Sequence, residues 1–422
     1  LYDGSSALAE AALMACQATR RRRILVAGSI HPDSRVVLET YARFSDTQLA
    51  WLPWDPRLGT LDPTELARRL DGETAAVLVQ SPNFFGLVED LAPLAEQTHS
   101  SGALFVVSSD PVALGILQPP GEVGADIVVG DGQALGNGLN FGGPSLGFFA
   151  ARQALLRRMP GRIVGETTDS QGRRGFVLTI QTREQHIRRE KATSNICTAQ
   201  VLLSIIASMF AVYNGPEGIR RMAARTHRLA EIFASAMTSF GYEIATKSFF
   251  DTVTIHAPGR AYTLFARAKE KRINLRYVDS DHLGISFDQS TRREELKRLL
   301  SVFKTDAAER ADIDALDKAT KETIPKSLAR TSSFLTHPVF EMYHSETEML
   351  RYLRHLQAKD VALDQAMIAL GSCTMKLNAT TEMIPVTWPE FNQIHPFAPL
   401  DQTAAYQAMF PPLESCLLYH SS

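Results

Sequence analysis

The sequence has few cysteines, no long apolar run and no excess of either charge. Its 4 cysteines lie far apart without a CxxC spacing, so they indicate neither a zinc site nor a disulfide framework, and we expect a reducing compartment. The longest apolar run extends only from Val201 to Tyr213, which is shorter than the about 20 residues of a bilayer span and predicts a buried helix. Lys plus Arg (44) nearly balance Asp plus Glu (46), so no global charge attracts nucleic acid. We therefore expect neither a membrane nor a nucleic-acid partner.

Two further absences concern lysine and the chain ends. No lysine occurs before Lys191. The chain begins at Leu1 rather than methionine, shows no targeting segment, and stops at Ser422 without an evident closing helix. Its 422 residues, 45% hydrophobic and 21% charged, otherwise fit a globular protein of two to three domains at about 150 residues each. We expect a fragment of a longer protein.

Short strand-like runs recur through the first 150 residues, with helical patterns between them. The runs cover residues 24–28, 75–80, 103–109, 125–130 and 147–150. Most are continuously apolar, which is typical of a parallel sheet covered on both faces by helices. One intervening helix is indicated by Asp62-Pro63, an N-cap followed by a proline at the first helical position. The alternation predicts a mostly parallel α/β sheet.

Beyond residue 200 the pattern changes to a smaller α+β arrangement. The apolar helix ends at Asn214-Gly215-Pro216, a second helix runs to Gly241, and strands and helices alternate up to residue 303. After a polar linker, the capping box Ser345-x-x-Glu348 opens an amphipathic helix. The predicted domains are a large α/β domain at 1–200, a small α+β domain at 201–303, a linker at 304–333 and an incomplete further unit at 334–422.

Two loops at the carboxyl ends of predicted strands are candidates for ligand binding. Asp110 follows the third strand, where ligands bind in α/β sheets, but it could equally cap the next segment. The glycine-rich turn at residues 130–138 could present backbone N–H groups to a phosphate, or could simply need positive φ angles. A dinucleotide fingerprint is not indicated, because it belongs after the first strand, where only Gly28 is present.

A charged segment and three histidines favour structural interpretations. Arg183 and Arg188 lie on neighbouring turns of a predicted helix and could form an anion-binding wall, but the i, i+4 pairs of opposite charge favour a solvated surface helix. His337, His344 and His355 lack the i, i+4 spacing of a metal-binding helix. We predict no metal site.

The segment at residues 371–378 combines a thiol, two hydroxyls, an ammonium and a carboxamide in one loop. These groups belong to Ser372, Cys373, Thr374, Lys376 and Asn378. So many hydrogen-bond donors suit the recognition of an anionic group such as a carboxylate, on a substrate or a cofactor. Cys373 would act as a nucleophile only as a thiolate with a neighbouring base. A binding loop and a packed turn fit the residues equally well.

Several segments together resemble the P-protein family of the glycine cleavage system, glycine dehydrogenase (aminomethyl-transferring, decarboxylating). The resembling segments are residues 80–86 (QSPNFFG), 159–163 (MPGRI), 181–197 (QTREQHIRREKATSNIC), 335–340 (LTHPVF), 344–348 (HSETE) and 371–378 (GSCTMKLN). They follow the family's order along almost the whole chain. Eight consecutive unusual residues at the last of them make the resemblance specific.

The resemblance implies an α/β fold of the fold-type I PLP-dependent transferase kind, built as two homologous halves. The first half would be a degenerate copy, and pyridoxal 5'-phosphate would lie in the second. The implied activity is decarboxylation of glycine, with transfer of the aminomethyl group to the lipoyl arm of the H-protein. The full-length enzyme would be a homodimer, or its halves would pair, in the cytoplasm of a bacterium or the mitochondrial matrix of a eukaryote.

The sequence departs from a complete enzyme of this family at the cofactor lysine. The turn after residues 125–130 is where a fold-type I enzyme places its Schiff-base lysine, and Gln133 and Ala134 stand there. Lys376 lies in the candidate loop, but the family's cofactor lysine comes later, in a stretch that this chain lacks. We therefore predict an inactive fragment that covers most of the first half and the start of the second. The alternatives are a non-catalytic pairing scaffold and another fold-type I enzyme, such as an aminotransferase.

Overall fold

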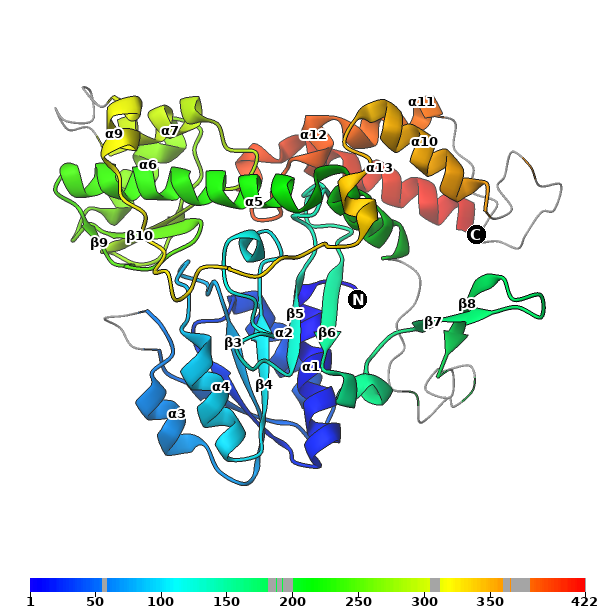
Figure 1. The fold of residues 1–422 in the computed structure, drawn as a ribbon. Coiled ribbons are helices and arrows are strands. Elements are labelled where there is room, and N and C mark those ends of the chain that lie inside the picture. Colours follow the sequence, from blue (N-terminus) through cyan, green and yellow to red (C-terminus); the bar gives the residue numbers. More distant parts are fainter. Residues whose placement is uncertain are drawn as a thin grey trace. The chain divides into compact units, whose positions relative to one another are not determined.

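The computed structural model describes residues 1–54, 59–180, 187, 192, 200–303, 312–359, 365 and 380–421. The chain forms two compact units. One consists of Leu1–Gly136 and Ser145–Tyr352, and the other of Asn137–Pro144 and Leu353–Ser422. All strands of the described residues belong to the first unit (Figure 1).

The main sheet of the first unit has six strands in the order β2-β1-β3-β4-β5-β6. The strands are β1 (Arg23–Ala27), β2 (Gln48–Leu52), β3 (Thr74–Gln80), β4 (Leu104–Ser108), β5 (Ile127–Asp131) and β6 (Gly147–Ala151). The first five are parallel and β6 is antiparallel to β5, so the predicted mostly parallel sheet is confirmed. Strand β2 was not predicted, because this edge strand is only partly buried and carries no continuous apolar signal.

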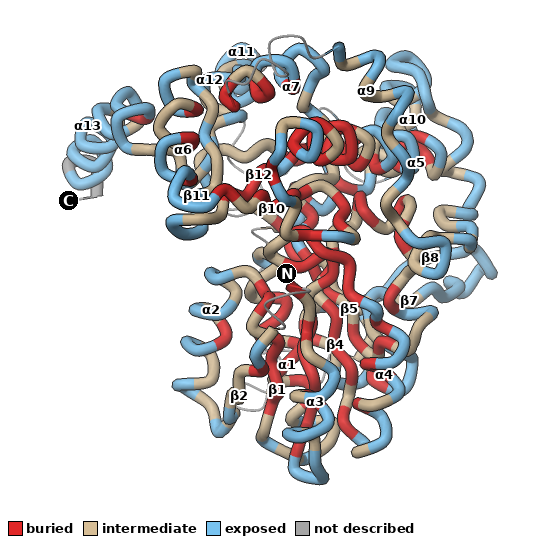
Figure 2. Tube along the Cα trace, turned by 90° about the vertical axis from the view of Figure 1, so that its left-hand side faces the viewer, coloured by how far each residue is buried: buried red, intermediate tan, exposed pale blue. Residues whose placement is uncertain are grey.

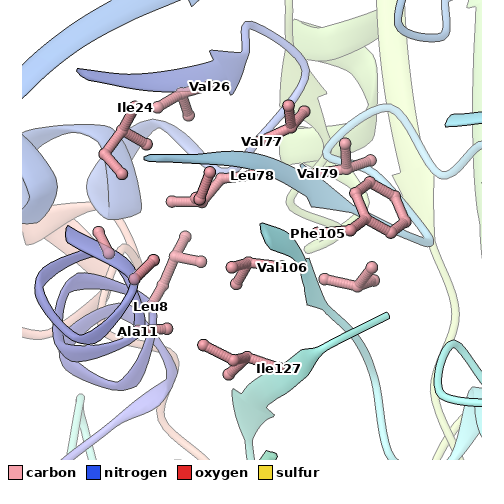
Figure 3. Close-up of a cluster of buried hydrophobic side chains, with 14 of the residues drawn as sticks. Leu8, Ala11, Ile24, Val26, Val77, Leu78, Val79, Phe105, Val106 and Ile127 are labelled. Carbon is pink, nitrogen blue, oxygen red and sulfur yellow. The ribbon is translucent and has the colours of Figure 1, made fainter. Parts of the chain in front are cut away.

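Helices pack against this sheet and complete its core. They are α1 (Gly4–Thr19), α2 (Pro32–Arg43), α3 (Pro63–Arg69) and α4 (Leu91–Ser100). Asp62 caps α3 as predicted, because its side chain accepts a hydrogen bond from the Thr64 backbone N–H at 2.8 Å. Figure 3 shows Leu8 of α1 facing Val106 and Ile127, and all three side chains are at most 1% exposed.

A second, antiparallel sheet has the strand order β11-β12-β10-β9. Its strands are β9 (Glu243–Ile244), β10 (Thr252–His256), β11 (Arg276–Tyr277) and β12 (His282–Ser286), and the neighbouring helices are α6 (Ala261–Glu270), α7 (Arg293–Leu300) and α9 (Ile313–Ala319). Phe233, Val253 and Leu283 are fully buried in its core. Figure 2 shows that buried residues concentrate in the strands of this sheet and of the main sheet.

The element α5 (Val201–Ser239) consists of two helical stretches that meet at Gly215, which agrees with the predicted end of the first helix at Asn214-Gly215-Pro216. Gly215 has φ +61° and is not helical, but Pro216 starts the helix again at once. A Cβ at Gly215 would lie 2.6 Å from the backbone oxygen of Phe340. The expected break is therefore a local kink at one glycine, where the chain needs both a positive φ and a close approach.

Two short strands, β7 (Ile163–Thr168) and β8 (Arg174–Thr179), form a hairpin that pairs with no other strand of the described residues. Short 3-10 turns connect other elements of the unit: η1 (Ala113–Gly115), η2 (Gln153–Arg158), η5 (Ser301–Phe303) and η6 (Pro338–Glu341).

The second unit consists of helices and turns. They are α11 (Thr380–Met383), η7 (Ile384–Thr387), α12 (Pro389–Asn392), η8 (Leu400–Gln402) and α13 (Ala404–Ser421), with α10 (Glu346–Gln357) crossing the boundary between the units. The predicted capping box of α10 is present, since the Glu348 backbone N–H donates to Ser345 Oγ at 3.4 Å and the Ser345 backbone N–H donates to Glu348 Oε2 at 3.2 Å. The expectation of no closing helix was wrong, because α13 continues through Pro411-Pro412, a pair that weakens the helical signal.

Within the described part of the chain, no helix is long and apolar enough to cross a membrane. The same residues contain no group of three or more His, Cys, Asp or Glu side chains arranged to hold a metal ion.

Candidate functional site

The carboxyl ends of β3, β4 and β5 lie along one edge of the main sheet, the edge at which α/β proteins bind ligands. The loops that follow these strands carry the polar side chains that the sequence analysis singled out, together with others that it missed. The geometry of these loops decides what this edge can do chemically.

The loop after β3 is held by its own side chains. Asn83 Oδ1 accepts hydrogen bonds from the backbone N–H groups of Phe85 at 3.0 Å and Leu87 at 3.1 Å. Asn83 Nδ2 donates to Glu89 at 2.9 Å, and Glu89 also accepts from the backbone N–H of Leu61 at 3.1 Å. Burial raises the pKa of Glu89 to about 7, although these hydrogen bonds act in the opposite direction. Glu89 thus holds the loop after β3 in place through its hydrogen bonds to Asn83 and Leu61.

A cleft with about 380 Å³ of empty space lies beside Glu89, lined by Ser81 and Ser109 on one side and by Leu114, Leu117 and other apolar residues. Ser109 Oγ donates to the Ser81 backbone oxygen at 2.8 Å, and Ser81 Oγ accepts from the Glu89 backbone N–H at 3.2 Å. Both serines are therefore used within the protein, and the other polar residues of the lining are Glu89, Asp90 and Gln118.

Asp110, at the end of β4, acts as a cap. Its Oδ1 accepts from the backbone N–H groups of Val112 at 2.7 Å and Ala113 at 3.4 Å, at the start of η1. Of the two interpretations left open by the sequence, the structure shows the cap. Burial and the charge of Asp110 raise the pKa of Asp251, which immediately precedes β10, to about 7. The effect of Asp110 on Asp251 shows that the loop after β4 lies near the start of β10.

Arg276 on β11 links the second sheet to the loop after β3. Its Nη1 donates to the backbone oxygen of Phe84 at 2.7 Å, and its Cζ lies 4.2 Å from the centre of the Phe84 ring. Its Nε and Nη2 are buried without a hydrogen-bond partner. Burial lowers the pKa of Arg276, although the charge of Asp251 partly opposes this. The sequence analysis missed Arg276, because the contact joins segments almost two hundred positions apart and leaves no local signal.

Gln133 and Ala134 stand where a cofactor lysine is expected, and the turn that contains them is held by hydrogen bonds. Asp131, which ends β5, accepts from the Gln133 backbone N–H at 2.8 Å and from Ser145 Oγ at 2.9 Å. The Ala134 backbone oxygen accepts from Gln289 Nε2 at 3.0 Å. No lysine exists among the first 190 residues, which include all strands of the main sheet. This sheet edge therefore does not fit a covalently bound pyridoxal phosphate.

The glycine-rich turn after β5 needs its glycines for shape. Gly136 has φ +85°, and a Cβ there would lie 2.8 Å from the ring of Phe210. This supports the tight-turn interpretation. Among the histidines, His344 Nδ1 lies 2.8 Å from the Tyr213 backbone oxygen, and His337 caps η6 by accepting from the Val339 backbone N–H at 3.2 Å.

The residues that the sequence analysis placed closest to chemistry lie outside the described residues. This applies to Ser372, Cys373, Thr374, Lys376 and Asn378. It also applies to the candidate anion wall of Arg183 and Arg188. Their roles stay predictions.

Replacing Asp251 by asparagine is expected to flatten the pH dependence of stability. The pKa of Asp251 rises from its ordinary 3.8 to about 7 on folding. A raised pKa contributes stability that is fully present below the unfolded value and is lost as the pH rises through the folded value. The unmodified chain should therefore lose on the order of 3 kcal/mol of unfolding free energy between about pH 4 and pH 8. Urea unfolding across this range measures it, and equal pH slopes for both proteins would refute the assignment.

The family model and the curated relatives that match this chain point to one family. Residues 1–303 match the model of the glycine cleavage system P-protein family. The chain is 48% identical over 420 residues to glycine dehydrogenase (decarboxylating) of Xanthomonas euvesicatoria pv. vesicatoria, covering 99% of this chain and 42% of that protein. The chain thus spans about two fifths of the length of the curated relatives it matches.

Solved structures agree. An inhibitor-bound crystal structure of glycine decarboxylase (P-protein) matches with a TM-score of 0.66 and 38% identity, covering 72% of this chain and 70% of that chain. A C-DES variant with glycine covalently linked to its PLP cofactor matches with a TM-score of 0.52 and 14% identity, covering 72% of this chain and 80% of that chain, a likeness of fold alone. The predicted fold-type I PLP-dependent transferase-like fold is confirmed.

Proposed function

Because the chain belongs to the glycine cleavage system P-protein family, we propose that it is the cofactor-free part of a glycine dehydrogenase (decarboxylating). On this proposal residues 1–303 form most of the first half, comprising the large domain at 1–200, without its start, and the small domain at 201–303. Residues 304–333 are a linker, and residues 334–422 open the second half. The additional length of the relatives includes the rest of the second half.

The longer protein would decarboxylate glycine and pass the aminomethyl group to the lipoyl arm of the H-protein, with pyridoxal phosphate supplying the electron sink. The identity of 48% over 99% of the chain supports this activity. We further propose that Ser372, Cys373, Thr374, Lys376 and Asn378 contact the substrate or cofactor in that protein. We further propose a homodimer, or a pair of halves, as the working form, and the cytoplasm as its compartment, for which the bacterial origin of the relatives is the support.

One observation supports the proposal that this chain does not bind the cofactor itself. The main sheet has its fold-type I strands in place, yet Gln133 and Ala134 occupy the lysine position and Asp131 is used to hold the turn. The chain's own contribution is therefore a folded surface against which the cofactor-bearing part packs. An active aminotransferase is disfavoured on the same ground, because it too needs that lysine.

A chimera tests this proposal: residues 1–422 followed by the remainder of the Xanthomonas euvesicatoria relative, in the register of their alignment. We expect the chimera to release CO2 from glycine when pyridoxal phosphate and H-protein are present, and the chain alone to release none. After borohydride reduction of the cofactor-loaded chimera, a single labelled lysine should lie beyond residue 422. A stoichiometric label on Lys376 in the chain alone would contradict the proposal.

The same chimera tests the loop at residues 371–378. Ser372→Ala should raise the KM for glycine by about tenfold if its hydroxyl binds the substrate carboxylate. Ser301→Ala, which removes a hydroxyl bonded only to the Arg298 backbone oxygen at 2.6 Å, is the matched control and should leave KM unchanged. Equal KM values for both variants and the parent would remove Ser372 from the site.

A further inference from the structure

Two histidines lie directly opposite each other on the second sheet. His256 on β10 pairs with His282 on the antiparallel strand β12, and their ring centres are 4.9 Å apart with the ring planes inclined by 24°. Directly opposed residues of an antiparallel pair share one face of the sheet, so both imidazoles stand on the same side. The sequence analysis did not single out this pair, because the two histidines are far apart along the chain and meet only through strand pairing.

Each imidazole is held by a carboxylate at its Nδ1 atom. His256 Nδ1 lies 3.2 Å from Glu243 Oε2, and His282 Nδ1 lies 2.9 Å from Asp279 Oδ1. An ionised carboxylate only accepts hydrogen bonds, so in each neutral ring Nδ1 carries the hydrogen and Nε2 carries the lone pair. A carboxylate at the second ring nitrogen is the usual environment of a metal-binding histidine, because it fixes the tautomer and the ring orientation.

The Nε2 atoms of both histidines are available to a ligand. Within the described part of the chain, the hydrogen bonds and ion pairs of the two rings go only to Glu243 and Asp279, through Nδ1. Each histidine side chain is 34% exposed, so ions reach the pair from solvent. The two carboxylates also place negative charge beside the rings, which favours a cation there.

The pair of nitrogen donors fits a divalent transition metal. Neutral imidazole suits Zn2+, Cu2+ and Ni2+, whereas Mg2+ prefers oxygen ligands. Two nitrogens bound to one tetrahedral Zn2+ at about 2.0–2.1 Å lie about 3.3 Å apart, so the two rings need to turn toward each other to share an ion. The described residues contain no group of three or more His, Cys, Asp or Glu side chains arranged to hold a metal, so water completes the coordination.

We propose that His256 and His282 bind one Zn2+ ion through their Nε2 atoms, with Glu243 and Asp279 as the supporting carboxylates. The ion connects β10 and β12, the two central strands of the second sheet. Because it binds only where these strands are paired, it stabilises the folded chain, and the Tm should rise with Zn2+ concentration. This inference does not depend on the proposed function.

Histidine modification in the unmodified chain tests the site. We expect saturating Zn2+ to slow the reaction of His256 and His282 with diethyl pyrocarbonate by at least about tenfold, because a metal-bound Nε2 does not react. Mass spectrometry of the peptides measures this residue by residue. His99 is the internal control, because it too is paired with a carboxylate, Asp126 at 2.8 Å, but through Nε2, and its reaction should not change. Mg2+ should protect none of the three.

Titration calorimetry with Zn2+ provides a second measurement. His282→Gln should remove one bound Zn2+ per chain, and Glu243→Gln should weaken its binding by about tenfold, as is typical when the carboxylate behind a ligand is lost. His99→Gln is the matched variant and should leave Zn2+ binding unchanged.

Three results would overturn the inference: reaction rates of His256 and His282 that Zn2+ does not change, equal protection of His99, or equal protection by Mg2+. The same Zn2+ binding by His282→Gln and the parent would also overturn it. Since the modification experiment uses the parent chain, it decides the matter even if a variant fails to fold. Neither measurement involves glycine turnover, so a negative result leaves the proposed function standing.

Discussion

Replacing Gly86 by alanine is expected to lower the free energy of unfolding by on the order of 4 kcal/mol, through backbone strain and steric overlap together. Gly86 has φ +90°, a conformation that alanine rarely adopts. An added Cβ would lie 2.1 Å from the Thr252 backbone oxygen and 2.6 Å from the Thr252 Cβ. Because Thr252 belongs to the central strand of the second sheet, neither backbone can move aside alone.

The contact at Gly86 is part of the connection between the two sheets. The Gly86 backbone oxygen accepts from the Phe250 N–H at 3.0 Å, and the Val88 N–H donates to the Ser248 oxygen at 2.8 Å. The substitution should therefore also expose amides 248–250 to hydrogen exchange. Gly72→Ala is the control, because a Cβ there meets nothing within 4 Å, and it should change stability by less than about 1 kcal/mol. Similar urea midpoints for the two variants would refute the close contact between Gly86 and the Thr252 backbone.

Replacing Glu231 by alanine is expected to lower the free energy of unfolding by about 3 kcal/mol, because it removes the buried acceptor of the partly buried Arg228 guanidinium and of two further hydrogen-bond donors. Glu231 is 2% exposed and lies 3.1 Å from His227 Nε2 and 2.9 Å from Arg228 Nη1. It also accepts the Thr323 backbone N–H at 2.6 Å. Although burial acts to raise the pKa of Glu231, the hydrogen bonds from His227, Arg228 and the Thr323 backbone, together with the charge of His227, hold that pKa below its ordinary value.

The network around Glu231 fastens the segment after α9 to the long helix. Arg228 Nε donates to Asp317 at 2.8 Å, and Arg293 Nη1 donates to the same carboxylate at 2.8 Å. Loss of Glu231 should therefore increase proteolytic cleavage around residue 323 as well as lower the urea midpoint. Glu217→Ala removes an exposed carboxylate from the same helix, paired only with Arg220, and should change stability by less than about 1 kcal/mol. Equal stability losses for both variants would contradict the assignment.

The sequence pattern located the central strands of the main sheet but did not predict its edge strand β2 or the exposed strand β7. Strands β1, β3, β4 and β5 are continuously apolar because helices cover both faces, and that signal is unambiguous. The edge strand β2 and the exposed strand β7 carry no such signal, because neither is buried on both faces. Asp110 illustrates the limit for a site residue, since the same carboxylate at a strand end serves equally as a cap or a ligand until its neighbours are placed.

The sequence by itself determined what chemistry this sheet cannot perform. No lysine precedes residue 191, so no folding of residues 1–190 can place a side-chain amine at the cofactor position. The sequence also identified the family, because the local motifs can be recognised without a three-dimensional structure. Only the tertiary structure decided which groups connect the two sheets: Gly86 against Thr252, Asp110 beside Asp251, and Arg276 over Phe84. Each of these contacts joins residues more than a hundred positions apart, and such pairs arise from the packing of whole elements, which local periodicity does not encode.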